Sequence, residues 1–240
     1  MSLSDLCNGV FSSAKALSEG LEEPLKPEGL IDLVNQAIHL SNWLWEEIEK
    51  RHITDFEDIA CKNGCSWCCY KQVGVSPLEV FLIVEYLKNK KTTFSLEDLN
   101  SRLDTLDQQT NGLSSESRLE AQLPCAFLLE NSCSIYEVRP LACRGGNSID
   151  ADLCRRHVED MDNFQSEAEL EGHPDWIHAV PFHVMRVLRE GLTSGMRKWD
   201  LGQEKLELTA ATRIALQEKD ALEIWIAGKD IFANGRIKLN

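Results

Sequence analysis

The chain has 240 residues, of which 43% are hydrophobic and 27% charged, as is typical of a soluble globular protein. Its formal net charge is −14, so we expect neither nucleic acid nor an anionic membrane as a partner, because both would repel it. No run of eighteen apolar residues occurs, and the N-terminal segment lacks the basic leader and apolar run of a signal peptide. We therefore expect a cytoplasmic protein with reduced thiols, and the sequence names no protein partner.

The first helix is predicted over residues 27–51. Apolar residues recur there at three- and four-residue steps, and Pro27 suits the first helical turn. We expect Trp43 and Trp45 to be packing residues of this helix. The preceding residues, 1–26, show a mixed pattern that predicts no single element.

Two more helices are predicted after a cysteine-rich loop around Gly64. Ser76 suits the N-cap of the first, and Glu79 completes a Ser-x-x-Glu capping box. Residues 80–84 are apolar all round, so this helix should be buried and hold the loop against the core. Ser95 is the predicted N-cap of the next helix, which has leucines on one face.

The rest of the chain predicts short elements and further helices. A short helical run precedes Pro124, and apolar pieces around Asn131–Ser132 predict a small hairpin. The helices predicted after it cover residues 152–164, 181–190 closed by Gly191, 204–217, and 219–227 closed by Gly228.

The cysteines are clustered rather than scattered. The chain has nine, of which Cys7 stands alone and the other eight lie between Cys61 and Cys154. Cysteines that serve as small core residues would be spread along the whole chain. In a reducing compartment, such clustering points to metal or redox chemistry before disulfides.

The spacing of the thiols suits metal ligation. Cys61-x3-Cys65-x2-Cys68 lets three side chains converge from one loop, and thiolates are strong ligands for zinc and iron–sulfur clusters. Cys69 must diverge from its neighbour, so it serves a second metal, packs, or does redox work. Cys125, Cys133, Cys143 and Cys154 come from separate short segments. Eight thiols suffice for two four-cysteine sites or for one site with spare thiols.

Arginines accompany the cysteines, and they have two interpretations. Arg139, Arg144, Arg155 and Arg156 can offset the negative charge of thiolates, with Arg139 and Arg144 as the foremost candidates. Alternatively, these arginines solvate a loop or pair with nearby carboxylates. His157 follows Cys154 by three residues, a spacing that also arises by coincidence.

"CKNGCSWCCY" followed by "PCAFLLENSCSIYEVRPLACR" resembles the YkgJ-type cysteine-cluster family, which is described as zinc- or iron-chelating. The matching positions are Cys61, Cys65, Cys68, Cys69, Cys125, Phe127, Leu128, Cys133, Ile135, Tyr136, Arg139, Pro140, Cys143 and Arg144. The resemblance implies metal chelation by these cysteines without deciding between zinc and iron. Some relatives are associated with lysine N-methylation of flagellin, which keeps an enzymatic interpretation open.

A second pattern concerns the cofactor. Cys61, Cys65 and Cys68, with Trp67 before the last, have the spacing that radical S-adenosylmethionine enzymes use. S-adenosylmethionine is therefore a further candidate cofactor, although the βα alternation of that enzyme class is absent from the sequence.

The sequence therefore predicts a mostly α protein: a helical domain with a central cysteine-rich, loop-rich metal-binding segment and at most a small β-hairpin. Residues 1–60 form an N-terminal helical segment, 61–154 the cysteine-cluster core, and 155–240 a C-terminal helical segment packed on it, within one domain. The function expected is binding of an iron–sulfur cluster or zinc; the alternative is a cluster-dependent enzyme, such as an S-adenosylmethionine-dependent lysine N-methylase relative. The predicted metal ligands are Cys61, Cys65, Cys68, Cys69, Cys125, Cys133, Cys143 and Cys154, and no catalytic residue is named.

Overall fold

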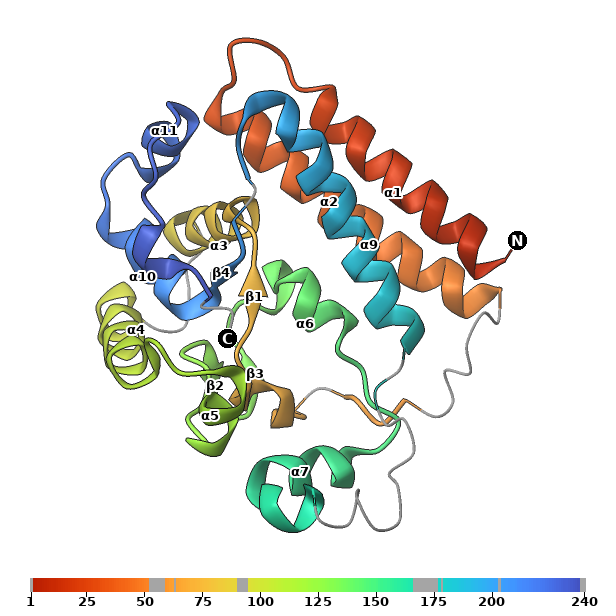
Figure 1. Cartoon of the computed structure of the whole chain (residues 1–240), viewed down its shortest axis with the longest axis vertical. Coiled ribbons are helices and arrows are strands. Elements are labelled where there is room, and N and C mark those ends of the chain that lie inside the picture. The colour runs from red at the N-terminus through yellow and green to blue at the C-terminus, as the bar shows by residue number, and fades with distance from the viewer. Residues whose placement is uncertain are drawn as a thin grey trace.

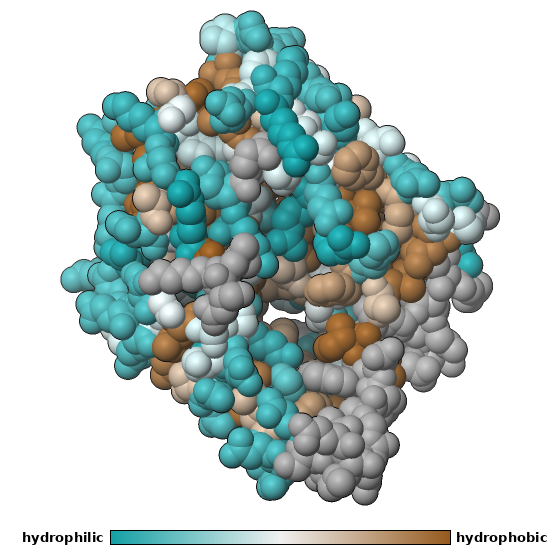
Figure 2. Space-filling model, in the orientation of Figure 1, coloured by the Kyte–Doolittle hydropathy of each residue, from teal (hydrophilic) through white to brown (hydrophobic). Residues whose placement is uncertain are grey.

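The structure is a computed structural model that describes residues 2–51, 59–62, 64–89, 95–165, 177, 179–202 and 204–237. It is mostly helical, which confirms the predicted class (Figure 1). Hydrophilic side chains dominate the face shown in Figure 2, as the net charge of −14 leads one to expect. Among the described residues, no helix has the length and apolar character needed to cross a membrane.

The secondary structure consists of helices and very short strands. The α-helices are α1 (Leu3–Glu19), α2 (Pro27–Lys50), α3 (Pro77–Asn89), α4 (Leu96–Thr110), α5 (Ser115–Glu120), α6 (Leu141–Gly145), α7 (Ala151–Glu159), α9 (Ala179–Met196), α10 (Leu208–Gln217) and α11 (Ala221–Ile226). Four 3₁₀ turns among the described residues are η1 (Trp67–Tyr70), η2 (Tyr136–Val138), η3 (Arg197–Trp199) and η4 (Ala233–Gly235). The strands pair antiparallel, β1 (Gly74–Val75) with β4 (Leu206–Glu207) and β2 (Leu128–Leu129) with β3 (Ser132–Cys133).

Helices α1, α2 and α9 lie side by side, and α3, α10 and α11 lie beside them (Figure 1). The predicted burial of α3 is confirmed, since Val80 and Ile83 are fully buried. One hydrophobic core joins residues from α1 to the turn at Phe232 and includes Leu44 and Leu188. Each large apolar side chain in it contributes about 1.5–3 kcal/mol by leaving water. These helices therefore share one core of packed, mostly aliphatic and aromatic side chains.

Helix α1 is an element that the mixed pattern of residues 1–26 did not predict. The Ser2 hydroxyl accepts a hydrogen bond from the Asp5 backbone N–H at 3.1 Å, and the Asp5 carboxylate accepts from the Ser2 N–H at 3.0 Å. This is a capping box that starts the helix. The helix then packs along α9 through small residues, so its buried face shows few large apolar side chains.

Gly191 does not close its helix, and that prediction was wrong. Helix α9 continues to Met196 because Gly191 and Gly195 are sites of close approach to α1. A Cβ on Gly191 would lie 2.6 Å from the Phe11 carbonyl oxygen, and one on Gly195 would lie 2.5 Å from the Lys15 carbonyl oxygen. The two glycines serve helix–helix packing rather than helix termination.

Of the other predicted features, some are confirmed and some are wrong. The hairpin is confirmed, with Glu130 and Asn131 at positive φ (46° and 62°) in a two-residue turn. The helix predicted from residue 204 begins only at Leu208, because β4 precedes it. Gly228 adopts φ +79° just after α11, as a helix-closing glycine should. Trp43 is 49% exposed, so the expectation that it packs was wrong.

Candidate metal centre

The first cysteine segment lies below the core in Figure 1, between the helices and α7. Cys61 and Cys65 are half-buried, in a segment that turns at Gly64 with φ +86°. Cys68 and Cys69 lie in η1, where Cys68 is exposed and Cys69 half-buried. The segment that was expected to be a loop therefore ends in a 3₁₀ turn that carries the adjacent pair.

The second cysteine segment is held against the first by a backbone hydrogen bond. The Cys125 N–H donates to the Cys69 carbonyl at 2.7 Å. The Leu128 N–H donates to the Cys125 carbonyl at 2.9 Å, and Leu128 pairs with Cys133 across the hairpin. The hairpin thus brings Cys133 back beside Cys125 and Cys69.

Glu79 fixes the helix that carries Cys143. Its carboxylate is 4% exposed, and one oxygen accepts from both the Ser76 N–H and the Ser76 hydroxyl at 2.8 Å. The other oxygen accepts from the Leu141 N–H at 2.8 Å, at the start of α6. The capping box predicted for α3 is confirmed, and the same carboxylate also caps α6, which the sequence did not indicate. Cys143, two residues further on, is placed by this bond.

Arg118 is a buried residue that the sequence analysis overlooked. It is 4% exposed and donates to the Tyr70 carbonyl at 3.2 Å and to the Leu123 carbonyl at 2.7 Å. These bonds join the end of η1 to the segment just before Cys125. Since Arg118 sits in a short polar run of α5, nothing in its local sequence marks it as a buried link.

Ser148 links Cys61 to Cys154. Its backbone N–H donates to the Cys61 sulfur at 3.1 Å, and its side chain hydrogen-bonds with the Cys154 thiol. Its carbonyl accepts from the Ala60 N–H at 2.8 Å. An N–H donor aimed at a cysteine sulfur is the kind of contact that surrounds metal-bound thiolates. No motif predicted this serine, which lies in the turn between α6 and α7.

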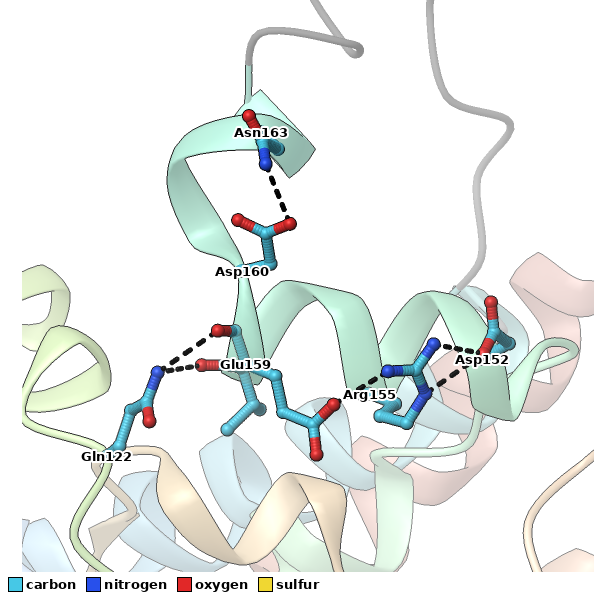
Figure 3. A network of polar contacts seen from close by, with 7 residues as sticks. Gln122, Asp152, Arg155, Glu159, Asp160 and Asn163 are labelled. Carbon is cyan, nitrogen blue, oxygen red and sulfur yellow. Dashed lines mark hydrogen bonds and ion pairs between the residues drawn. The ribbon is translucent and has the colours of Figure 1, made fainter.

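Helix α7, which carries Cys154, is attached at its C-terminal end (Figure 3). The Gln122 side chain donates to the carbonyls of Val158 at 2.8 Å and Glu159 at 3.4 Å. Arg155 binds Asp152 and Glu159 on the exposed side, at 2.7 Å each. Of the two interpretations given for the arginines, Arg155 follows the one in which it pairs with carboxylates.

Arg139 and Arg144 have different roles. Arg144 donates to the Asn42 side chain at 2.8 Å and to the carbonyls of Arg139 and Glu137, so it ties η2 to α2. The Arg139 guanidinium lies 4.3 Å from the centre of the Tyr136 ring, and its buried Nε has no hydrogen-bond partner among the described residues. Arg144 therefore links segments of chain, whereas Arg139 packs on the Tyr136 ring.

The thiols have perturbed acidities. Burial raises the pKa of Cys61, Cys133 and Cys154, raises that of Cys143 well above its ordinary value, and raises that of Cys125 to about 12. A hydrogen bond from Cys69 lowers the pKa of Cys68 to about 6, and the pKa of Cys69 rises because it keeps the shared proton. The positive charge of Arg139 lowers the pKa of Cys61, Cys68, Cys133 and Cys143, against the effect of burial, which raises the pKa of each of them. Most thiols must therefore lose a proton on binding a metal.

The cysteines are chemically suited to bind a metal as thiolates, but their side chains do not surround a common position in this structure. All nine cysteines are free thiols, eight of them on the segments joined above. Within the described residues, no three Cys, His, Asp or Glu side chains already form a group that would hold a metal ion. His157 stacks edge-on with Phe164 at 4.9 Å, and burial together with the charge of Lys71 lowers its pKa to about 4. The candidate metal donors on the joined segments are therefore thiols.

Comparison with known proteins gives one match. Residues 60–167 match the model of the CxxCxxCC family, described as "Putative zinc- or iron-chelating domain". No similar curated protein and no similar solved structure was found. The match covers the eight clustered cysteines and the elements that carry them, from η1 to α7. The match confirms, over residues 60–167, the resemblance to the YkgJ-type cysteine-cluster family.

Proposed function

We propose that this protein binds an iron–sulfur cluster or zinc through its clustered cysteines. The observation that carries the proposal is the convergence of four cysteine-bearing pieces of chain, from η1, the hairpin, α6 and α7, through the contacts of Cys125, Glu79 and Ser148. The ligands proposed are Cys61, Cys65, Cys68, Cys69, Cys125, Cys133, Cys143 and Cys154. The backbone contacts position these segments, so rotation of the thiol side chains is the movement that closes a site.

The surroundings of the thiols support a metal–thiolate centre. Metal-bound thiolates carry excess negative charge, which N–H donors and nearby cations offset. Ser148 supplies such a donor and Arg139 such a cation. Zinc would act there as a closed, tetrahedral centre, and an iron–sulfur cluster would carry electrons.

The role of the metal follows from the position of the core. Helices α1, α2, α3 and α9 contribute much of the hydrophobic core, which also includes Phe127, Ile135 and Leu141 from the cysteine-bearing segments. A chain with such a core does not need a metal in order to fold. We therefore propose a storing, sensing or transferring role for the bound metal, in a reducing compartment such as the cytoplasm, where free thiols persist.

The enzymatic alternative, a cluster-dependent enzyme that uses S-adenosylmethionine, requires a pocket that reaches an open metal position. A cavity of about 520 Å³ lies between α2, α3, α10 and α11, and no cysteine is among its lining residues. Metal binding without chemistry on a substrate is therefore the function that we place first.

The test is the metal and acid-labile sulfide content after strictly anaerobic purification, with a visible absorption spectrum. Iron with sulfide identifies a cluster, and S-adenosylmethionine binding then distinguishes the enzymatic alternative. Stoichiometric zinc in a colourless protein identifies a zinc centre and removes the enzymatic alternative. A protein that contains neither metal refutes the proposal.

A further inference from the structure

The cavity of about 520 Å³ between α2, α3, α10 and α11 has an apolar interior. All of its buried lining residues are apolar: Phe81, Val84, Ala215 and Ala221. The Phe81 ring packs against Trp225 and Phe232, whose ring centres lie 5.3 and 5.5 Å from its own. Ligand-binding pockets usually have a volume of about 300–1,000 Å³ and a mostly apolar lining. The cavity therefore has the size and the interior of a ligand-binding site.

The rim of this cavity is acidic. All of its exposed lining residues are charged, and they comprise five carboxylates and one ammonium group: Glu28, Asp32, Glu85, Asp220, Glu223 and Lys88. Asp32 and Glu85 accept hydrogen bonds from the neutral side-chain amides of Gln36 and Asn89. None of the five carboxylates forms an ion pair with a described residue, whereas carboxylates elsewhere on the surface do. The rim thus carries an excess of negative charge, which is complementary to a cationic ligand.

The five carboxylates are spread around the cavity rather than gathered at one point. They come from α2, from α3 and from the start of α11. Within the described residues, no three Cys, His, Asp or Glu side chains form a group that would hold a metal ion. A metal cation needs several oxygen ligands around a single position. A ligand that matches this rim must instead carry positive charges at separate points, joined by apolar segments that can lie against the interior.

The hydrogen-bonding groups of the lining narrow the class of cation. Carboxylates only accept hydrogen bonds, and Lys88 and Asn35 are the only described lining residues whose side chains donate. A peptide brings carbonyl oxygens that need donors, whereas a protonated aliphatic polyamine brings only N–H donors and methylene groups. We propose that the cavity binds an aliphatic polyamine, with its ammonium groups at the carboxylates of the rim and its methylene segments against the apolar interior.

The polyamine site is separate from the metal centre. No cysteine lines the cavity, and none of its lining residues lies within residues 60–80, 89–214 or 224–240. The inference therefore goes beyond the proposed function and does not depend on it. The net charge of −14 attracts any polycation to the whole surface, so a test must separate binding in the cavity from that general attraction.

The test is isothermal titration of the full-length protein with spermidine at low ionic strength. The wild-type chain is expected to bind one equivalent. The double variant Asp32→Asn/Glu223→Gln neutralises one carboxylate on α2 and one on α11, and it should weaken binding about tenfold, as loss of two exposed charge pairs predicts. Glu46→Gln/Glu97→Gln makes the same change of net charge at exposed sites of α2 and α4 outside the cavity, and it should weaken binding less than about twofold.

Four results would overturn the proposal. They are the absence of spermidine binding, equal weakening in the two double variants, full displacement of spermidine by Mg²⁺ at the same concentration of positive charge, and tighter binding of a tetralysine peptide than of spermidine. The second and third would mean that the surface attracts cations without a site, and the fourth would mean a peptide site. Far-UV circular dichroism checks that each variant is folded, and Glu28→Gln/Glu85→Gln replaces the cavity variant if it unfolds.

Discussion

Glu79 allows the placement of Cys143 to be tested by a single substitution. Its carboxylate accepts three hydrogen bonds at 2.8 Å, from the Ser76 N–H, the Ser76 hydroxyl and the Leu141 N–H. In Glu79→Gln, the amide keeps one oxygen acceptor, and its NH₂ group cannot accept from a backbone N–H. One buried N–H of α3 or α6 therefore loses its partner.

The expected cost follows from that loss. A hydrogen bond to a charged group contributes about 1.5–3 kcal/mol, and an unsatisfied buried donor costs a similar amount. We expect the free energy of unfolding of Glu79→Gln to fall by about 2–3 kcal/mol. For a chain of this size, that corresponds to a drop in melting temperature of roughly 4–12 °C.

The assay is thermal and urea unfolding, followed by circular dichroism in the same metal state as the wild type. Glu85→Gln is the matched control, because it makes the same charge change on an exposed site of the same helix and should shift stability by less than about 0.5 kcal/mol. Equal stability of Glu79→Gln and Glu85→Gln would refute the assignment of a double helix cap to Glu79. Weaker metal binding by Glu79→Gln alone would show that α6 places Cys143.

Three further predictions concern packing, charge and pH. Gly191→Ala should lower the free energy of unfolding, measured in urea, by about 1–3 kcal/mol, because the new Cβ would lie 2.6 Å from the Phe11 carbonyl oxygen. Gly9→Ala is the control, since a Cβ there would meet no atom within 4 Å. Equal effects of the two substitutions would contradict the close packing of α1 on α9. Arg139→Gln should weaken metal affinity about tenfold, measured in competition with a chelator, while Arg155→Gln, on the exposed side of α7, should leave the affinity unchanged. A larger loss of affinity in Arg155→Gln than in Arg139→Gln would contradict the role of the Arg139 charge in offsetting the thiolates. Burial raises the pKa of most thiols, so they are protonated at neutral pH and a metal must displace those protons. The affinity for Co²⁺ should therefore fall as pH falls, by up to about tenfold per pH unit for each proton displaced. A Co²⁺ affinity that does not change with pH would show that the ligands are not these thiols.

Features that depend on neighbouring residues could be predicted from the sequence. The Ser76–Glu79 capping box, the Ser95 cap and the hairpin at Glu130–Asn131 all follow from chemistry within a few residues. Helix α1 and the continuation of α9 past Gly191 did not follow. Both depend on the close contact of two helices that are far apart in sequence, which small residues permit and no local signal marks.

The same distinction applies to the metal centre. The cysteine cluster is recognisable from its spacing and from the family motif, and the role of its members as metal ligands stays a prediction. Ser148, Arg118 and the second bond of Glu79 are not recognisable from the sequence, because each acts where the chain folds back on a distant segment.

The most direct test of the account is X-ray absorption spectroscopy at the edge of the bound metal. Cysteine ligation predicts a first shell of sulfur, at about 2.3 Å for zinc. A first shell dominated by nitrogen or oxygen, at about 2.0–2.2 Å, would contradict the claim that these cysteines hold the metal.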